Sequence, residues 1–371
     1  MKPESFNPDR LVLARRRRGM TKVDLAKLVK LTTRSLYDFE SGKAEPSQET
    51  LDLIAETLKF PTPFFQRTSV PTPTVQAASF RSLKSMTAGQ RDAALAAGAL
   101  AFELSQWIDG EFELPVPDVP SIREQEPDAA AMMVRTHWKI GELAIGNLIH
   151  LLESKGIRIY SLTEEGKSLD AFSLWHKNVP FVFLNTNKTA EHSRMDAAHE
   201  LGHLVLHRHG GPQGRDVEKD AQAFASAFLM PSGSVLSVAK RFNAPSLQHL
   251  VQLKKNWGVS VAAMNYRLHA LGLLTEWQYR MLCIEIAKYG RTREPEGMPR
   301  ESSQVLSKVL TSLRESGVSK ADVARQLGLY TEDVDALIFG LGISPTAEGR
   351  TRPDAAADGR RRGLRLASRN S

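Results

Sequence analysis

The sequence predicts a mostly helical α+β fold divided into an N-terminal helical domain, a central domain with a small β-sheet, and a helical C-terminal region. Short helices with recognisable caps fill residues 8–66, and helical periodicity returns after residue 300. Between them, three short apolar runs precede an H-E-x-x-H pentapeptide at 199–203. Domains of different composition are therefore expected along one chain.

The composition suits a multidomain protein with basic ends. The 371 residues are enough for two or three domains, and the single cysteine, Cys283, excludes an intrachain disulfide or a cysteine-rich metal site. Residues 1–70 carry 13 Lys/Arg and 9 Asp/Glu, a charge of +4, and residues 341–371 carry 7 and 3, also +4. We expect a cytoplasmic protein without a signal peptide or membrane span, whose ends touch nucleic acid; solvated surface charge is the alternative.

Residues 1–66 are predicted to form one domain of four or five helices. The first runs from about 9 to 18 and ends at Gly19, and a capping box of Thr21 and Asp24 opens the second. TRSLYDFESG at 33–42 forms the third, and SQETLDLIAETLKF at 47–60 the fourth, where apolar residues recur at helical spacing.

This layout resembles the lambda-repressor-like (XRE-type) helix-turn-helix domain. The resemblance rests on Arg15, Gly-Met-Thr at 19–21, Leu25-Ala26, the segment 37–42 and Pro46. It implies that double-stranded DNA is bound by a recognition helix from about Thr33 to Ser41, with contacts from Thr32, Thr33, Arg34, Ser35, Tyr37 and Lys43. Arg15–Arg18 are expected to contact the DNA backbone or to form a solvated face. Tyr37 can instead be core, and core is the better interpretation of Phe39. Some domains of this type bind proteins instead of DNA.

The central domain is predicted to span 80–290, after a Pro- and Thr-containing linker at 67–79. An alanine-rich helix should run from residue 80 to about 108, and one long helix from about 128 to 155. The runs GIRIYSL, AFSLWH and PFVFLN then predict three short strands before the helix that carries the H-E-x-x-H motif.

The motif places His199 and His203 on one face of a helix, so that both imidazoles can bind one metal ion. Glu200 lies on the adjacent edge, where it can deprotonate a water molecule. His207 is excluded as a ligand because about 12 Å of helix rise separates it from His199. A third ligand is expected from the helix 216–229, where Glu218 is favoured over Asp220; Glu218 can also be only a carboxylate that stabilises the helix N-terminus.

The segment 185–231 resembles the ImmA/IrrE family of metallopeptidases. The resemblance rests on Asn185, Arg194, AHELGH at 198–203 and EKDAQAFASAFLMP at 218–231. It implies a zincin-like domain in which His199, His203 and Glu218 bind one Zn²⁺, or another divalent metal, and Glu200 is the catalytic base. Asn185 and Arg194 would support the site or the substrate. Asp196 departs from the usual Arg-x-Phe-Thr pattern and adds a carboxylate at the start of the motif helix.

The region 300–345 is predicted to be helical and similar to a helix-turn-helix, with a capping box of Ser319 and Asp322 and a second cap at Thr331. Three roles are open for it: a second DNA contact, dimerisation, or packing on the central domain. The Arg- and Ala-rich tail 346–371 is predicted to be disordered.

The two resemblances together imply a cytoplasmic DNA-binding transcriptional regulator with zinc-dependent endopeptidase activity, which cleaves a repressor or antitoxin-like protein. No membrane partner is expected, and a homodimer is compatible with the sequence. The alternative is a sensor-type transcription factor in which the peptidase fold detects a ligand or metal without catalysis, although the intact Glu200 counts against it. A fused toxin–antitoxin or phage-immunity component is a third hypothesis.

Overall fold

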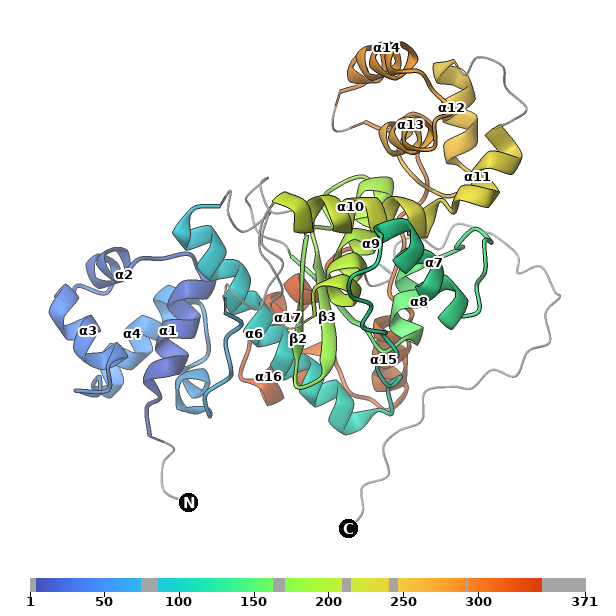
Figure 1. The fold of residues 1–371 in the computed structure, drawn as a ribbon. Coiled ribbons are helices and arrows are strands. Elements are labelled where there is room, and N and C mark those ends of the chain that lie inside the picture. The colour runs from blue at the N-terminus through green and yellow to red at the C-terminus, as the bar shows by residue number, and fades with distance from the viewer. Residues whose placement is uncertain are drawn as a thin grey trace.

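The computed structural model describes residues 5–74, 86–162, 171–208, 215–239, 246–290 and 293–341. The predicted linker beyond residue 74 and the tail 346–371 lie outside these residues. The alanine-rich helix, predicted from residue 80 to about 108, begins only at Ala88, where Thr87 caps it, and ends at Glu111. The prediction of a mostly helical α+β fold with a small sheet is confirmed (Figure 1). The helices are α1 (Pro8–Arg17), α2 (Lys22–Leu28), α3 (Thr33–Glu40), α4 (Gln48–Leu58), the 3-10 helix η1 (Thr62–Gln66), α6 (Ala88–Glu111), α7 (Pro127–His137), α8 (Leu148–Ser154), α9 (Ala190–Leu206), α10 (Arg215–Leu229), α11 (Ser232–Ala239), α12 (Leu247–Lys254), α13 (Val261–Ala270), α14 (Glu276–Ala287), α15 (Gln304–Glu315), α16 (Lys320–Leu327) and α17 (Thr331–Ile338).

The N-terminal helices begin at side-chain caps that the sequence predicts. Thr21 and Asp24 form the expected capping box of α2, and Thr32 and Ser47 cap α3 and α4. Apolar residues from all four helices are buried, as are Phe60, Phe64 and Phe65 in and before η1. The domain therefore has a core of its own. It packs against α6 through α1 (Figure 1).

A three-stranded sheet lies at the centre of the larger body. Its strands are β1 (Arg158–Ser161), β2 (Ala171–His176) and β3 (Val179–Leu184), in the order β1-β3-β2, with β1 parallel and β2 antiparallel to β3. All three predicted strands are present. Side chains alternate between the two faces of the sheet, and helices cover both faces. Phe172 stacks on Phe183 on the face covered by α6, whereas Ser173 contacts α9 on the other face. Among the described strands β2 is an edge strand.

The predicted helix over 128–155 is wrong: α7 ends at His137, and α8 starts only at Leu148. Backbone with positive φ at Lys139 and Gly141 breaks the helix between them. Carbonyl groups of this loop are satisfied by the buried guanidinium of Arg135, which donates to the carbonyls of Gly141 and Leu143. Apolar periodicity continues through the break, and for this reason the sequence did not reveal it.

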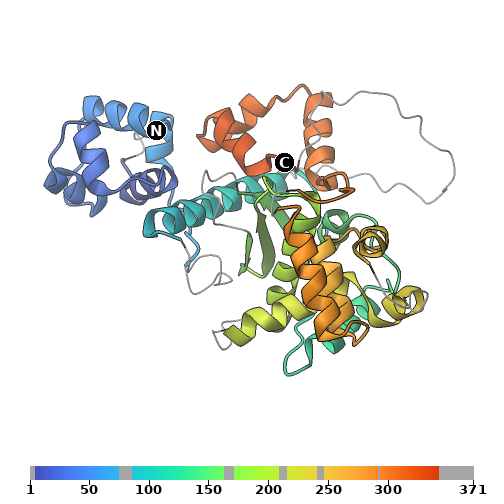
Figure 2. The ribbon, with the colours of Figure 1, turned by 90° about the horizontal axis from the view of Figure 1, so that it is seen from above.

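The C-terminal helices α15–α17 pack on the rest of the protein, which is one of the three roles left open for them. Figure 2 shows them beside α6, and α15 also contacts α8. The capping box of Ser319 and Asp322 is confirmed. The cap at Thr331 is wrong, because α17 begins at that residue and its N-cap, Tyr330, makes no side-chain cap hydrogen bond.

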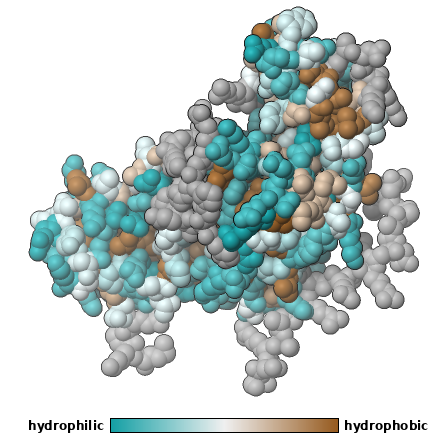
Figure 3. Space-filling model, in the orientation of Figure 1, coloured by the Kyte–Doolittle hydropathy of each residue, from teal (hydrophilic) through white to brown (hydrophobic). Residues whose placement is uncertain are grey.

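The helices α11–α14 project from the body and present hydrophobic surface (Figures 1 and 3). On α14, Trp277, Met281 and Ile284 are exposed, and Trp277 is the most exposed of the three at 71%. Within the described residues no single helix is long and apolar enough to cross a membrane. One bent pair, α10 with α11, meets the same length and composition criteria.

Candidate metal and catalytic site

The crossing of α9 and α10 builds the candidate site. Thr189 caps α9, which is 17 residues long and carries the whole H-E-x-x-H motif. Gly202 lies at a close contact between the two helices: a Cβ atom built on it would be 3.2 Å from both Cα and O of Ala221. Because neither residue has a large side chain, α10 can bring Glu218 close to the histidines of α9.

Three side chains point their ligand atoms at one place. His199 Nε2 lies 3.0 Å from His203 Nε2 and 3.2 Å from Glu218 Oε2, and His203 Nε2 lies 3.7 Å from Glu218 Oε1. One ligand atom from each residue lies within 4.8 Å of the other two. Two imidazole nitrogens at this separation repel each other unless they share a proton or a cation.

These separations fit a zinc ion. Tetrahedral zinc with bonds of about 2.0–2.1 Å places its ligands about 3.3 Å apart. His207 lies behind His203, with the two Nδ1 atoms 3.2 Å apart, so it is placed to orient a ligand and not to be one. Among the described residues the cluster contains Glu218 but not its predicted competitor Asp220. The carboxyl of Asp220 has a raised pKa through burial and the nearby charges of Asp216 and Glu126.

The electrostatics of the cluster reflect its opposite charges. Burial lowers the pKa of His199, but the hydrogen bond to Glu218 and the carboxylates of Glu200, Glu218 and Asp196 outweigh it and raise the pKa above its ordinary value. Burial raises the pKa of Glu218, but the two histidines outweigh it and hold that pKa well below its usual range. Burial and the charge of His203 lower the pKa of His207 to about 4. The glutamate is therefore ionised and able to bind a cation.

Glu200 is buried beside this cluster and accepts a hydrogen bond from a residue of the sheet. It is 3% exposed, and Ser173 Oγ donates to its Oε2 over 2.7 Å. Sequence reasoning did not identify Ser173. Its signal is a polar residue within the apolar strand AFSLWH, at a position that faces a helix.

Asn185 lies in the turn that precedes the motif helix, and Arg194 lies on that helix. Asn185 follows β3, and its Oδ1 accepts a hydrogen bond from the backbone N–H of Asn187 at 3.0 Å. Arg194 is 2% exposed; it pairs with Glu301 and donates to the backbone carbonyl of Ile145. Since Arg194 precedes His199 by five positions, the two point to different sides of α9. The structure therefore brings Arg194 to the C-terminal segment and not to the histidines.

The predicted DNA-contacting residues lie on and around α3, at the end of the N-terminal domain that faces away from α6 (Figure 1). Thr32 caps α3 through the backbone N–H of Ser35. Tyr37 is 44% exposed and has three cationic groups near its ring: Lys22 Nζ at 4.8 Å, Lys43 Nζ at 5.4 Å and the guanidinium of Arg34 at 6.0 Å. The side chain of Arg34 is 77% exposed and pairs with Asp38 at 3.2 Å, and Thr33 is exposed beside it.

The expectation that Arg15–Arg18 form a DNA-backbone contact or a solvated face is corrected for the two ends of this run. Arg15 is 8% exposed and pairs with Glu40 at 2.5 Å. Arg18 pairs with Asp333 of α17 at 2.8 and 3.0 Å. Carboxylates from distant parts of the chain neutralise both guanidinium groups, which the local sequence does not reveal.

Comparison with known families finds both halves of this architecture. Residues 11–65 match the helix-turn-helix family, and residues 152–269 match the IrrE N-terminal-like domain family, a metallopeptidase type. The second match is narrower than the predicted domain of 80–290. No curated protein matches the chain. The XRE-type and ImmA/IrrE resemblances are confirmed, and the chain joins a DNA-binding helix-turn-helix domain to an IrrE-like metallopeptidase domain.

Proposed function

We propose that this protein is a transcriptional regulator that is also a zinc-dependent endopeptidase. The observation that carries the proposal is the convergence of His199, His203 and Glu218 beside Glu200. Three protein ligands leave a position for substrate, as in catalytic rather than structural zinc sites. A ligand-sensing module without catalysis would not require an oriented carboxylate beside the ligands.

Each residue has a role in peptide hydrolysis. A zinc ion bound by the two histidines and Glu218 would supply the Lewis acidity that polarises the scissile carbonyl. Glu200 accepts a proton from the attacking water and delivers it to the leaving amine. Ser173 fixes the orientation of that carboxylate through its 2.7 Å hydrogen bond. His207 lies against His203 and limits its rotation.

The edge of β2 offers a place for the substrate backbone. An extended peptide can pair with an edge strand through main-chain hydrogen bonds. Because Ser173 of β2 contacts Glu200 directly, a peptide on that edge passes beside the proposed base. The family resemblance favours a repressor or antitoxin-like protein as the substrate, which the helix-turn-helix domain would meet on DNA.

Double-stranded DNA is the proposed partner of the N-terminal domain. We assign contacts to Thr32, Thr33, Arg34, Ser35, Tyr37 and Lys43, because these residues surround the outward end of α3. The cations around Tyr37 suit phosphate groups on either side of a groove. Lys43→Ala should weaken binding of all DNA sequences and reduce its salt dependence by about one counterion.

Metal content and cleavage together test the proposal. We expect about one zinc per chain by elemental analysis in the wild type and in Asp220→Ala, and little zinc in His203→Ala or Glu218→Ala. Glu200→Gln should keep its zinc and lose cleavage of the partner repressor. Regulation that survives unchanged in Glu200→Gln would instead support the sensor function. Full zinc in Glu218→Ala would contradict the assigned ligands.

A further inference from the structure

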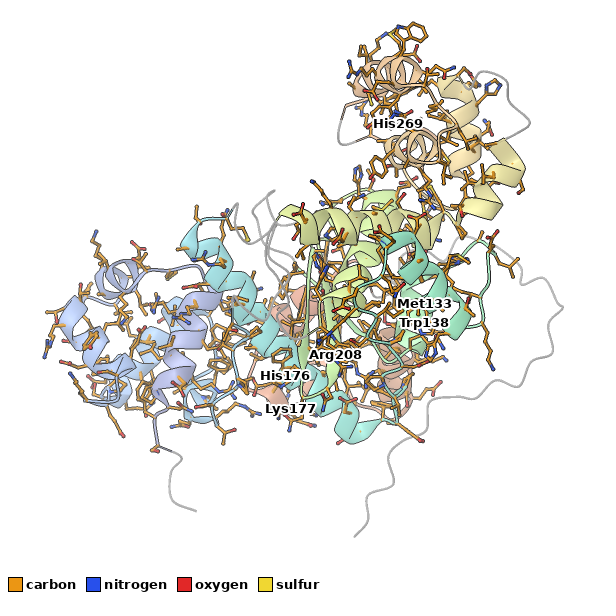
Figure 4. The ribbon with its side chains drawn as sticks, viewed as in Figure 1. Met133, Trp138, His176, Lys177, Arg208 and His269 are labelled. Atoms are coloured by element: carbon orange, nitrogen blue, oxygen red, sulfur yellow. The ribbon has the colours of Figure 1, made fainter. Side chains whose placement is uncertain are left out.

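A cation–π pair lies on the same face of the sheet as the proposed base. The guanidinium of Arg208, two residues after α9 ends, lies 3.8 Å from the ring centroid of Trp175. Trp175 follows Ser173 by two positions on β2, so both side chains face α9. Figure 4 shows Arg208 near the turn between β2 and β3, where His176 and Lys177 are labelled. Glu200 therefore contacts β2 at Ser173, and Arg208 contacts it at Trp175, the next residue on the same face. Two residues along a strand span about 6.7 Å.

The charge of Arg208 has no acidic partner among the described residues. Arg10, Arg15, Arg18 and Arg194 each pair with a carboxylate, whereas Arg208 only stacks on a ring. Its Nε and the Nε1 of Trp175 are buried without a hydrogen-bond partner in the described part of the chain. A second cation joins it, since Arg123 donates to the backbone carbonyl of Arg208 over 3.1 Å. Arg208 is half-buried, so its positive charge remains within reach of a ligand at this corner.

A substrate strand on the edge of β2 would place alternate side chains on the α9 face. One of them lies opposite Ser173 and the proposed base, and the next on that face lies opposite Trp175. We propose that Arg208, held against Trp175, selects an Asp or Glu side chain two residues from the substrate residue opposite Ser173. This inference rests on the proposed peptidase function, because it assumes that the substrate is a peptide. It can be tested by measuring peptide binding without any cleavage.

The test uses the full-length Glu200→Gln protein, loaded with zinc, and two fluorescent dodecapeptide pools. Both pools are random in uncharged residues, and one has a single central Asp where the other has a single central Lys. We expect binding of the Asp pool to be about tenfold tighter, the lower end of the range for one charge-assisted hydrogen bond. Adding Arg208→Glu should reverse this preference, whereas adding Arg280→Glu, on the exposed face of α14, makes the same change of charge and should leave it intact.

Equal binding of the two pools, an unchanged preference in the Arg208→Glu protein, or no binding of either pool would overturn the inference. Thermal unfolding of each variant shows that the comparison is made on folded protein. Cleavage of the same pools by protein with Glu200 intact separates this inference from the proposed function. Cleavage without charge preference rejects the subsite alone, and charge-dependent binding without cleavage rejects the peptidase alone.

Discussion

Replacement of Gly202 by alanine should weaken both the fold and the metal site. The added Cβ would lie 3.2 Å from Cα and O of Ala221 and from Cδ1 of Phe224. Two of these three atoms belong to the backbone of α10, and both residues are fully buried. A side chain can rotate away from such a contact, but a buried helix backbone has to move as a unit.

The magnitude follows from two opposing effects. Alanine is favoured over glycine inside a helix by about 1 kcal/mol, and overpacking of a close contact costs about 1–3 kcal/mol. The net change is a loss of about 0–2 kcal/mol in the free energy of unfolding. The zinc affinity is the more sensitive quantity, because α10 carries Glu218 and α9 carries both histidines. Ligand distances tolerate only about 0.2 Å, so we expect the affinity to fall about tenfold.

Urea unfolding of the metal-free protein and competition with a zinc chelator measure the two effects. Gly110→Ala is the matched control, since it lies within α6 and a Cβ there meets no atom within 4 Å. The control should gain up to about 1 kcal/mol and keep its zinc affinity. The reasoning is refuted if Gly202→Ala gains as much stability as Gly110→Ala and binds zinc as tightly as the wild type.

Three further predictions concern other contacts. Ser173→Ala should keep its zinc and slow cleavage about tenfold, because one hydrogen bond to the proposed base is lost; unchanged kcat would reject its positioning role. Asp333→Ala leaves the guanidinium of Arg18 without its carboxylate and should lower the free energy of unfolding by about 1–3 kcal/mol. Asp335→Ala, which breaks a half-exposed pair, should cost under about 1 kcal/mol, and equal losses in urea unfolding would contradict the difference. Burial raises the pKa of Glu153 above its ordinary value near 4.5, so its charged form opposes folding. The stability of the wild type relative to Glu153→Gln should therefore fall as the pH rises through and above about 4.5, and a rise would show that the sign is wrong.

The part of the site that one helix encodes could be predicted from the sequence. His199 and His203 converge because a helix repeats every 3.6 residues, and no tertiary information is needed for that. Glu218 required an argument about a second helix, and small residues at the crossing supplied it. Ser173 could not be found in this way, because its contact with Glu200 depends on how a strand packs against a helix 27 residues away.

The contacts that join the domains had no local signal at all. Arg18 and Asp333 are 315 positions apart, and each resembles a residue with a local role, a basic helix end and an acidic first turn. Their pairing acts together with that of Arg10 and Glu103, which holds α1 to α6. These two ion pairs therefore attach the N-terminal domain on the side that faces α6 and α17, while α3 lies on the opposite side (Figure 1). A domain held in this way would present the proposed DNA at a fixed orientation to the rest of the chain, whereas a flexible tether would not. Ion pairs across such distances are set by the completed fold, and for this reason the arginine run was interpreted as a contact for the DNA backbone or a solvated face.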